Sequence, residues 1–288
     1  MKNMKKIWAL LLSLVMVLSL AACGGSKEEP AKEEAPAEAQ EEQATAEETT
    51  DADSDLAYVQ NKGVLVVGIT DFEPMDYKDA DGNWIGFDAD MAVAFAKSLG
   101  VDVEFVEIDW DNKILELDSQ AIDCVWNGMT LTDEVTSAME CSNAYCNNAQ
   151  VVIVPADKAE QYQTVEDCAG LAFAVEAGSA GEAEISALGY NYTPVKAQSD
   201  ALMEVAAGTS DAAVIDSLMA AAMVGEGTGY ASLTYTCGLN SEEYGVGFRK
   251  GSDLAQKLND FFKASYADGS MMQIAETYGV QAAIIEQK

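Results

Sequence analysis

The sequence contains no histidine, and Arg249 is the single arginine among its 288 residues. The lack of histidine excludes acid–base catalysis by histidine, nucleophilic triads that depend on histidine, and histidine-ligated metals. Basic residues are scarce overall, since 16 Lys and Arg stand against 49 Asp and Glu, for a formal net charge of −33. Because nucleic-acid phosphates require Lys and Arg, we expect no nucleic-acid partner. We also predict no cofactor and no bound metal.

The apolar run near the N-terminus is too short to cross a bilayer. Residues 7–20 make 14 positions, whereas a membrane-spanning helix needs about 20. Three lysines precede the run and Leu20-Ala21-Ala22-Cys23 ends it, an order typical of a secretory signal over residues 1–22. The tetrad resembles a bacterial lipobox, which implies acylation of Cys23 and a lipid-anchored protein on the outer face of the cell membrane. An ordinary signal peptide with a chance cysteine is the alternative.

The segment after Cys23 lacks aromatic residues altogether. Residues 24–55 are rich in Glu, Ala, Pro, Gln and Thr. Such a segment cannot bury enough apolar surface to offset its ordering entropy. We therefore predict that residues 23–56 form a disordered acidic linker, extended by charge repulsion. A functional acidic tail is the alternative interpretation.

Five cysteines follow Cys23, so at least one thiol stays unpaired within the chain. Cys124 lies in the apolar run 122–126 and is expected to be a small core residue. Cys141 and Cys146 are too far apart for a zinc knuckle and have no second pair nearby. We favour reduced, buried thiols, with a disulfide as the alternative. The five are Cys124, Cys141, Cys146, Cys168 and Cys237.

From residue 57 onward, short apolar runs alternate with helical patterns. Residues 63–69 predict a buried strand, and residues 87–99 predict a helix that ends at Gly100. This alternation indicates an α/β fold with parallel strands. About 230 folded residues are more than a single hydrophobic core usually accommodates, so two lobes are expected. Further strands are expected at 101–106, 122–126, 151–154, 171–175, 212–215 and 245–248, and helices at 114–119, 178–188, 201–207, 217–224, 252–268 and 270–278.

Several sequence segments, each weak alone, together carry a family resemblance. Their order and spacing across residues 57–280 resemble the bacterial extracellular solute-binding proteins of family 3, which feed amino acids to ABC importers. The matching segments are 73–77, 84–91, 108–111, 127–132, 175–182, 211–217 and 243–251.

The resemblance implies a two-lobed periplasmic-binding-protein-like fold of type II, with a ligand cleft between lobes joined by two hinge strands. Lobe 1 is expected over residues 57–148 and lobe 2 over 149–244, and residues 245–288 return through the hinge to lobe 1. The implied function is capture of an amino acid or a related amine-bearing solute by hinge closure. The implied partners are that small molecule, the permease of an ABC importer, and the membrane through the lipid anchor. We expect a monomer.

Two aromatic residues follow predicted strands, where ligands of α/β sheets bind. The resemblance implies that Phe72 and Trp110 stack on the ligand side chain, and a core position is the alternative for each. Trp126 is expected to be a core residue.

The other candidate ligand-binding residues also come from the resemblance. Asn127, Gly128, Met129 and Thr130 follow a strand, and the family uses this segment to bind the α-amino and α-carboxylate groups of its ligands. A plain turn is the alternative, although Gly128 permits close backbone approach. Ser179 and Ala180 open a helix whose N–H groups suit a carboxylate, and Ser179 also suits a helix cap. Asp216 matches the acid that pairs with the ligand ammonium, with helix capping as the alternative.

One position departs from the family pattern. The family usually has an arginine that grips the ligand carboxylate where this chain has Val135, and Arg249 cannot replace it. Either backbone N–H groups and Thr130 alone hold a carboxylate, or the ligand has none. We expect no enzymatic activity. The alternatives are a dehydratase-like enzyme on the same fold and a solute sensor that acts through a partner.

Overall fold

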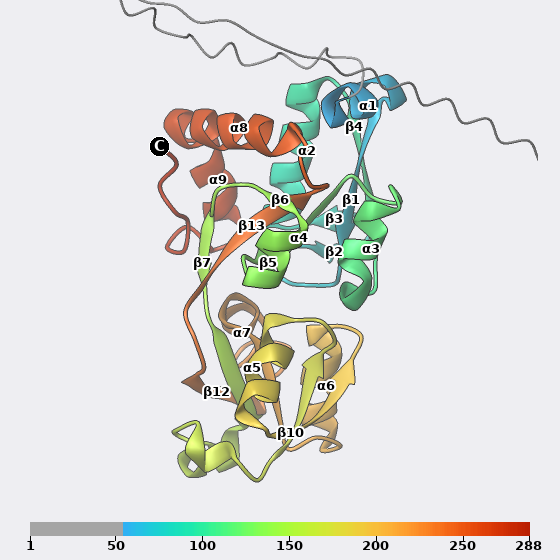
Figure 1. Cartoon of the computed structure of the whole chain (residues 1–288). Helices are drawn as coiled ribbons and strands as arrows, with labels where there is room; N and C mark the ends of the chain where they lie inside the picture. The colour runs from blue at the N-terminus through green and yellow to red at the C-terminus, as the bar shows by residue number, and fades with distance from the viewer. Residues whose placement is uncertain (1–53) are drawn as a thin grey trace, which may run out of the picture. The chain divides into compact units, whose positions relative to one another are not determined.

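The computed structural model describes residues 54–288 and places them in two lobes, each built on its own β-sheet (Figure 1). The predicted signal peptide, the acylation site Cys23 and the linker up to residue 53 lie outside the described residues. Within 54–288, no helix has both the length and the apolar character needed to span a membrane.

Lobe 1 is a mixed sheet with helices packed around it. Its strands are β1 (Val64–Ile69), β4 (Asp102–Glu107), β5 (Cys124–Thr130), β6 (Glu140–Cys141), β7 (Cys146–Asn148) and β13 (Glu242–Phe248), beside a small hairpin of β2 (Tyr77–Lys78) and β3 (Trp84–Ile85). Its helices are α1 (Asp55–Lys62), α2 (Phe87–Leu99), α3 (Lys113–Asp118), α4 (Asp133–Ala138), α8 (Leu254–Asp268) and α9 (Ser270–Thr277), with a 3₁₀ turn at Trp110–Asn112. The strand order is β4-β1-β5-β13-β6, and β7 pairs with β13. β1 is parallel to β4 and β5, whereas β13 is antiparallel to β5.

Lobe 2 is a smaller sheet of the same kind. Its strands are β8 (Gln150–Pro155), β9 (Ala172–Glu176), β10 (Asn191–Val195), β11 (Ala212–Asp216) and β12 (Leu233–Gly238), and its helices are α5 (Ala180–Leu188), α6 (Gln198–Ala207) and α7 (Ser217–Met223), with 3₁₀ turns at Ala156–Gln161 and Glu166–Cys168. The strand order is β10-β9-β11-β8-β12. β9 is parallel to β10 and β11, whereas β8 is antiparallel to β11 and β12.

Central strands are buried on both faces, which explains why they read as continuous apolar runs in the sequence. All of β11 is buried, and all of β5 except Thr130. The predicted helix 87–99 coincides with α2, and Gly100 ends it in the left-handed conformation at φ 78°. Polar side chains lie at the carboxyl ends of β5, β9 and β11, where these buried strands finish.

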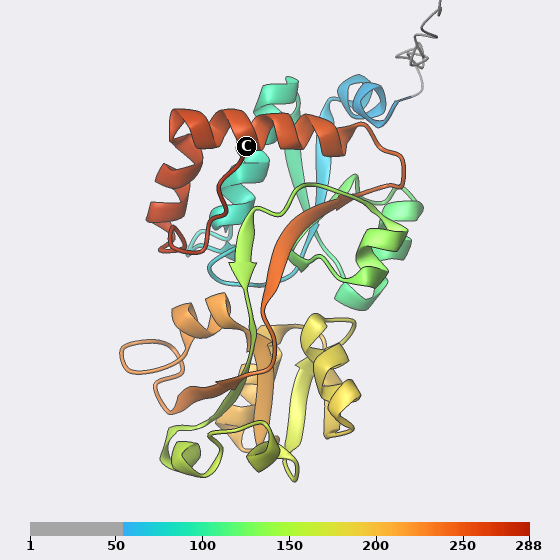
Figure 2. The same ribbon diagram turned by 60° about the vertical axis from the view of Figure 1, so that its left-hand side comes forward.

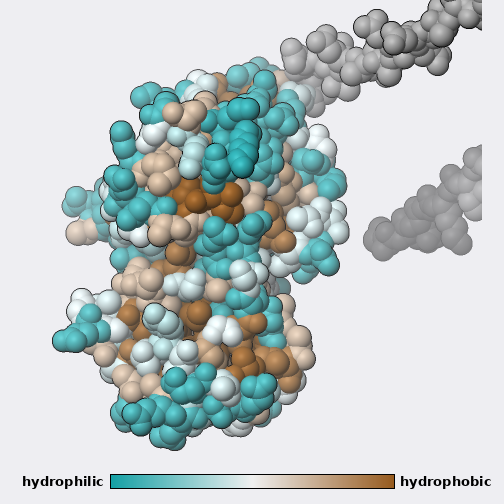
Figure 3. Space-filling model, turned by 90° about the vertical axis from the view of Figure 1, so that its left-hand side faces the viewer, coloured by the Kyte–Doolittle hydropathy of each residue, from teal (hydrophilic) through white to brown (hydrophobic). Residues whose placement is uncertain are grey.

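Two chain segments pass between the lobes. Asn148 of β7 pairs with Glu242 in the sheet of lobe 1, whereas Gln150 of β8 pairs with Asp216 in the sheet of lobe 2. The second segment runs from β12 into β13, and Figure 2 shows both as extended chains between the lobes. Figure 3 shows a constriction between the lobes and, on this face, hydrophobic patches on both lobes among hydrophilic residues. This architecture matches the predicted two-lobed fold.

Candidate functional site

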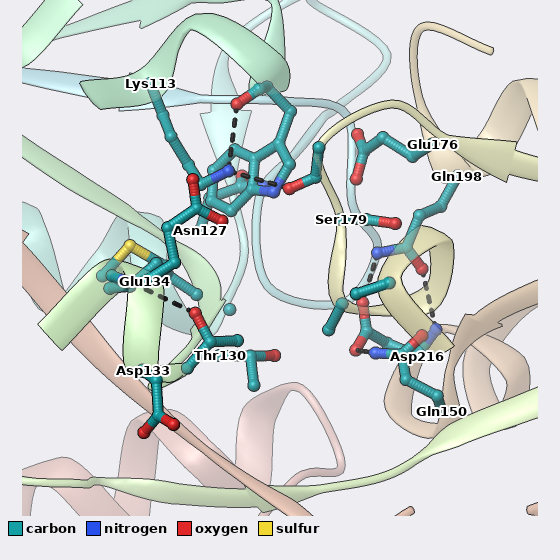
Figure 4. A pocket seen from close by; sticks show the side chains of 18 residues that line it. Lys113, Asn127, Thr130, Asp133, Glu134, Gln150, Glu176, Ser179, Gln198 and Asp216 are labelled. Carbon is teal, nitrogen blue, oxygen red and sulfur yellow. Dashed lines mark hydrogen bonds between the residues drawn. The ribbon is translucent and has the colours of Figure 1, made fainter. Parts of the chain in front are cut away.

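A cavity of about 250 Å³ lies between the lobes, at the carboxyl ends of strands from both sheets (Figure 4). It brings together eight of the nine residues predicted to bind the ligand. These are Trp110, Asn127, Gly128, Met129, Thr130, Ser179, Ala180 and Asp216. Their contact with a ligand stays a prediction.

Phe72 is the predicted ligand-stacking residue that does not line this cavity. Its side chain is buried in lobe 1, edge-on to Tyr244 with the ring centroids 6.3 Å apart. The loop after β1 closes on itself, because the N–H of Phe72 donates to the Asp76 carbonyl and the N–H of Asp76 donates to the Phe72 carbonyl. Phe72 thus occupies a core position, the alternative given for it, and its stacking on a ligand stays a prediction that this geometry does not support. Trp126 is fully buried, as expected.

The lobe 1 wall of the cavity is made by the end of β5, whose polar groups are engaged inside the lobe. The Asn127 amide donates to Thr70 Oγ1 at 2.8 Å and accepts from the Thr70 N–H at 2.9 Å. The Thr130 hydroxyl donates to Glu242 Oε1 at 3.0 Å. In this structure the Thr130 hydroxyl therefore has no free proton to donate to a ligand carboxylate.

Packing and backbone conformation require a glycine at position 128, and the approach of its backbone to a ligand stays a prediction. Its φ is +55°, and a Cβ placed there would lie 2.4 Å from the Phe72 ring. Its N–H donates to Asp88 Oδ2 at 2.7 Å, an oxygen that also accepts from the Tyr145 hydroxyl at 2.7 Å. Burial raises the pKa of Asp88 to about 7. The buried Asp88 carboxylate therefore holds the backbone at the end of β5 in place from inside lobe 1.

Trp110 and Lys113 close the cavity from the loop after β4. The Lys113 ammonium lies 4.9 Å from the centroid of the Trp110 ring and donates to the Trp110 carbonyl at 3.3 Å. It also donates to the Gly178 carbonyl of lobe 2 at 2.8 Å. Burial lowers the pKa of Lys113. Lys113 thus links the two lobes at the edge of the cavity.

The first turn of α5 supplies backbone donors from lobe 2. Ser179 caps the helix, because its hydroxyl accepts from the Glu182 N–H at 3.0 Å. The Glu182 carboxylate in turn accepts from the Gly178 N–H at 2.7 Å. The N–H groups of Ala180 and Gly181 have no partner inside the helix. The predicted anion site at this helix start is therefore compatible with the cap.

Asp216 ends β11 within a network of side-chain amides. Its Oδ1 accepts from Gln150 Nε2 at 2.6 Å and from the Asn148 amide, and its Oδ2 accepts from the Gln198 amide. Burial, followed by the charge of Glu242, raises the pKa of Asp216 to about 8. It forms no side-chain cap for α7. Three amides therefore already donate to this buried acid, so its burial alone does not require a ligand ammonium.

Glu176, which ends β9 next to the strand of Asp216, is a residue whose place at the cavity was not predicted from the sequence. Its side chain is 2% exposed, yet Oε1 has no hydrogen-bond partner among the described residues. Burial, followed by the charge of Asp216, raises its pKa to about 8. An acid that directly follows a buried strand and precedes a glycine-rich helix start was the available sequence signal. The polar residues Gln150 and Gln198 that line the cavity were missed as well.

The charges around the cavity are unequal. Lys113 is the one cation among the residues that line it, and four acids line it: Asp133, Glu134, Glu176 and Asp216. Arg249 lies elsewhere, with Nη2 at 2.9 Å from Asp55 and 3.5 Å from Asp123. Val135 lines the cavity, so the departure from the family pattern falls on its lining.

The described residues offer little for a metal or a disulfide. Within residues 54–288, no group of three or more Cys, Asp or Glu side chains is arranged to hold a metal ion. The five cysteines of this part of the chain are all free thiols.

Comparison with known proteins adds the family to this geometry. The model of the bacterial extracellular solute-binding proteins, family 3, matches residues 65–281. The arginine-binding extracellular protein ArtP of Bacillus subtilis is 27% identical over 224 residues, which cover 75% of this chain and 86% of that protein. The L-cystine-binding protein TcyJ of Escherichia coli K12 is 27% identical over 232 residues, which cover 77% and 85%.

A solved structure shows the same fold. An ABC uptake transporter substrate-binding protein from Streptococcus pneumoniae with bound histidine superposes with a TM-score of 0.73 at 29% identity, covering 81% of this chain and 99% of that chain. The family match extends over both lobes and both connecting segments. The chain therefore belongs to the bacterial extracellular solute-binding proteins of family 3.

Proposed function

We propose that this chain is the solute-binding component of an ABC importer and that it binds an amino acid or a related amine-bearing solute between its lobes. The observation that carries the proposal is one cavity on which the first turn of α5, Glu176 and Asp216 converge. An amino acid has an anionic and a cationic end, which a helix start and a carboxylate respectively bind. The relatives named above bind arginine, cystine and histidine, which supports the class of ligand.

The solute carboxylate is bound by backbone N–H groups of α5, at Ala180 and Gly181. No arginine lines the cavity, and the Thr130 hydroxyl is committed to Glu242. The solute ammonium meets Asp216 at Oδ2, which accepts one amide hydrogen bond and retains capacity for a further one, whereas Oδ1 already accepts two.

Lobe closure over the solute is the proposed mechanism. The hinge is formed where β7 continues into β8 and where β12 continues into β13. Contacts from both lobes favour the closed form, and a solute shifts the equilibrium only by its extra affinity for that form. The Lys113 ammonium already donates to the Gly178 carbonyl across the lobes, a contact that opening of the lobes would break.

The experiment is isothermal titration calorimetry of the purified protein against a panel of amino acids and biogenic amines. We expect at least one compound to bind with an increase in melting temperature, because ligands that bind only the native state stabilise it. If no nitrogenous compound binds, the proposal is contradicted.

Membrane attachment through Cys23 and delivery to a permease belong to the same proposal. The predicted lipobox before Cys23 supports them. Cys23→Ala is expected to move the protein from the membrane fraction to the soluble fraction and to abolish an acylated N-terminal peptide in mass spectrometry.

A dehydratase-like activity is the second candidate, because a carboxylate with a pKa of about 8 suits acid–base work. Four acids and one lysine line the cavity, which disfavours the anionic substrates of such an enzyme. We expect no turnover of a cyclohexadienyl acid by the natural protein or by Asp216→Asn. Turnover that Asp216→Asn abolishes would favour the enzyme instead.

A further inference from the structure

We propose that Glu176 forms a second cation subsite in the cleft, so that the natural solute carries a positively charged side chain as well as its α-ammonium. The inference rests on the proposed function and narrows the class of solute. Figure 4 shows the Glu176 carboxylate on the lobe 2 side of the cavity, facing Lys113 and Asn127 across it.

The first step is the difference between two neighbouring carboxylates. Asp216 and Glu176 end adjacent parallel strands of lobe 2 and line the same cavity. Both oxygens of Asp216 accept from side-chain amides, whereas Glu176 Oε1 is buried without a partner. Buried polar atoms in native proteins are generally satisfied. An unsatisfied acceptor that faces a binding cavity therefore indicates that the ligand supplies the donor.

The second step is that no protein cation satisfies Glu176. Lys113 is the one cation that lines the cavity, and its ammonium donates to the carbonyls of Trp110 and Gly178. The charge of Lys113 lowers the pKa of Glu176, but burial and the charge of Asp216 raise this pKa by more. A cationic ligand group beside Glu176 would balance a cavity whose charged lining is mostly acidic.

The third step is proton linkage, which gives a separate readout. In the free protein the two carboxylates titrate near pH 8, and a ligand cation lowers their pKa values by favouring the ionised form. Below about pH 8, binding a cation therefore releases protons, and affinity rises with pH until the carboxylates ionise without the ligand. Lys113 of α3 acts on Glu176 and Glu242 of β13 acts on Asp216, and Asp133 and Glu134 of α4 line the same cavity.

The experiment uses two pairs of ligands that differ mainly in side-chain charge, L-arginine with L-citrulline and L-lysine with L-norleucine. Calorimetry is run on the purified protein, on Glu176→Gln, and on Glu160→Gln as the matched control. Glu160 is exposed on the same lobe, so the control removes the same charge away from the cavity. The natural protein is expected to bind the charged member of at least one pair about tenfold tighter or more, because a buried charge pair discriminates strongly.

Glu176→Gln is expected to lose about tenfold or more in affinity for the charged member and little for the neutral one, while Glu160→Gln changes neither. Proton release, measured at pH 7 in buffers of different ionisation enthalpy, is expected for the charged member and to be reduced in Glu176→Gln. A melting temperature at least equal to that of the natural protein would show that the variant folds.

Three results would overturn the subsite while leaving the proposed function intact. They are equal or tighter binding of the neutral members, unchanged binding of the charged members by Glu176→Gln, and binding of charged members without proton release. If no member of either pair binds, and no compound of the wider panel binds, the proposed function itself fails.

Discussion

In the lobe 1 wall of the cleft, the end of β5 engages its polar groups inside its own lobe, whereas in the lobe 2 wall the end of β9 and the start of α5 keep hydrogen-bonding capacity for the cavity. Asn127 is paired with Thr70, and the Gly128 N–H is held by Asp88. On the other side, Glu176 Oε1 and the first N–H groups of α5 remain available. The end of β5 therefore supplies a fixed surface and lobe 2 adds unpartnered groups opposite it, while the acids that line the cavity come from both lobes.

Asp216→Ala should have the largest effect on stability and binding among the substitutions that test this difference between the walls. It would leave the amides of Asn148, Gln150 and Gln198 without their shared acceptor, and each buried unpaired group costs about 1–3 kcal/mol. We expect the free energy of unfolding to fall by about 3–5 kcal/mol and solute binding to be lost. Urea denaturation and calorimetry measure the two effects. Asp157→Ala, at an exposed position of lobe 2, is the control, and equal stability of both variants would show that the amide network does not hold this wall.

Gly128→Ala tests the rigidity assigned to lobe 1. The left-handed backbone costs an alanine about 1–2 kcal/mol, and the Phe72 ring 2.4 Å from the new Cβ adds to it. Gly82→Ala is the matched control, since φ there is +85° with nothing within 4 Å of a Cβ. We expect the larger loss of unfolding free energy, about 2–4 kcal/mol, at Gly128. Equal losses would mean that the ring moves aside freely.

The fold was largely predictable from the sequence, and the exceptions have physical causes. The helix 87–99 was predicted to the residue because its apolar spacing and Gly100 agree. β10 was missed because it is a largely exposed edge strand that contains Pro194, and such strands lack the buried pattern that marks β11.

The site was predictable where a strand end alone decides the position of a residue. Trp110 and Asp216 line the cavity as expected, and so does Val135, whereas Phe72 does not. Phe72 and Trp110 look alike in the sequence, since both are aromatic residues after a strand. The packing of the Phe72 ring against Tyr244, which is distant in the sequence, is a tertiary property that spacing does not reveal. The role of Glu176 required knowledge of which acid has hydrogen-bond partners.

Lys113→Met tests whether the two walls communicate through closure. It removes the ammonium that bonds the Gly178 carbonyl of lobe 2, so we expect an affinity loss of about tenfold from a less stable closed form. Lys196→Met is the control. Lys196 also faces lobe 1, at 3.6 Å from Glu107 and 3.7 Å from Asp109, but these pairs are exposed and contribute little. Calorimetry gives the affinities and small-angle X-ray scattering the closed fraction. Equal losses in both variants would refute a specific contribution of Lys113.

Val135→Arg has the smallest expected effect. It tests the difference between the walls by adding a positive charge to the lobe 1 wall. Val135 lines the cavity and is 3% exposed, packed in the cluster that contains Trp110 and Met129. A guanidinium there can pair bidentately with a carboxylate, so amino acids should bind more tightly, by up to about tenfold.

Val135→Met controls for the added volume, which costs stability wherever it strains the core. The decisive readout is calorimetry with an amino acid and its decarboxylated amine, L-arginine with agmatine. If Val135→Arg improves L-arginine alone, the solute carboxylate points toward lobe 1 and the helix start of α5 shares it. Equal changes for both ligands would mean that the carboxylate is held by lobe 2 alone. The end of β5 would then shape the cleft without binding the solute carboxylate.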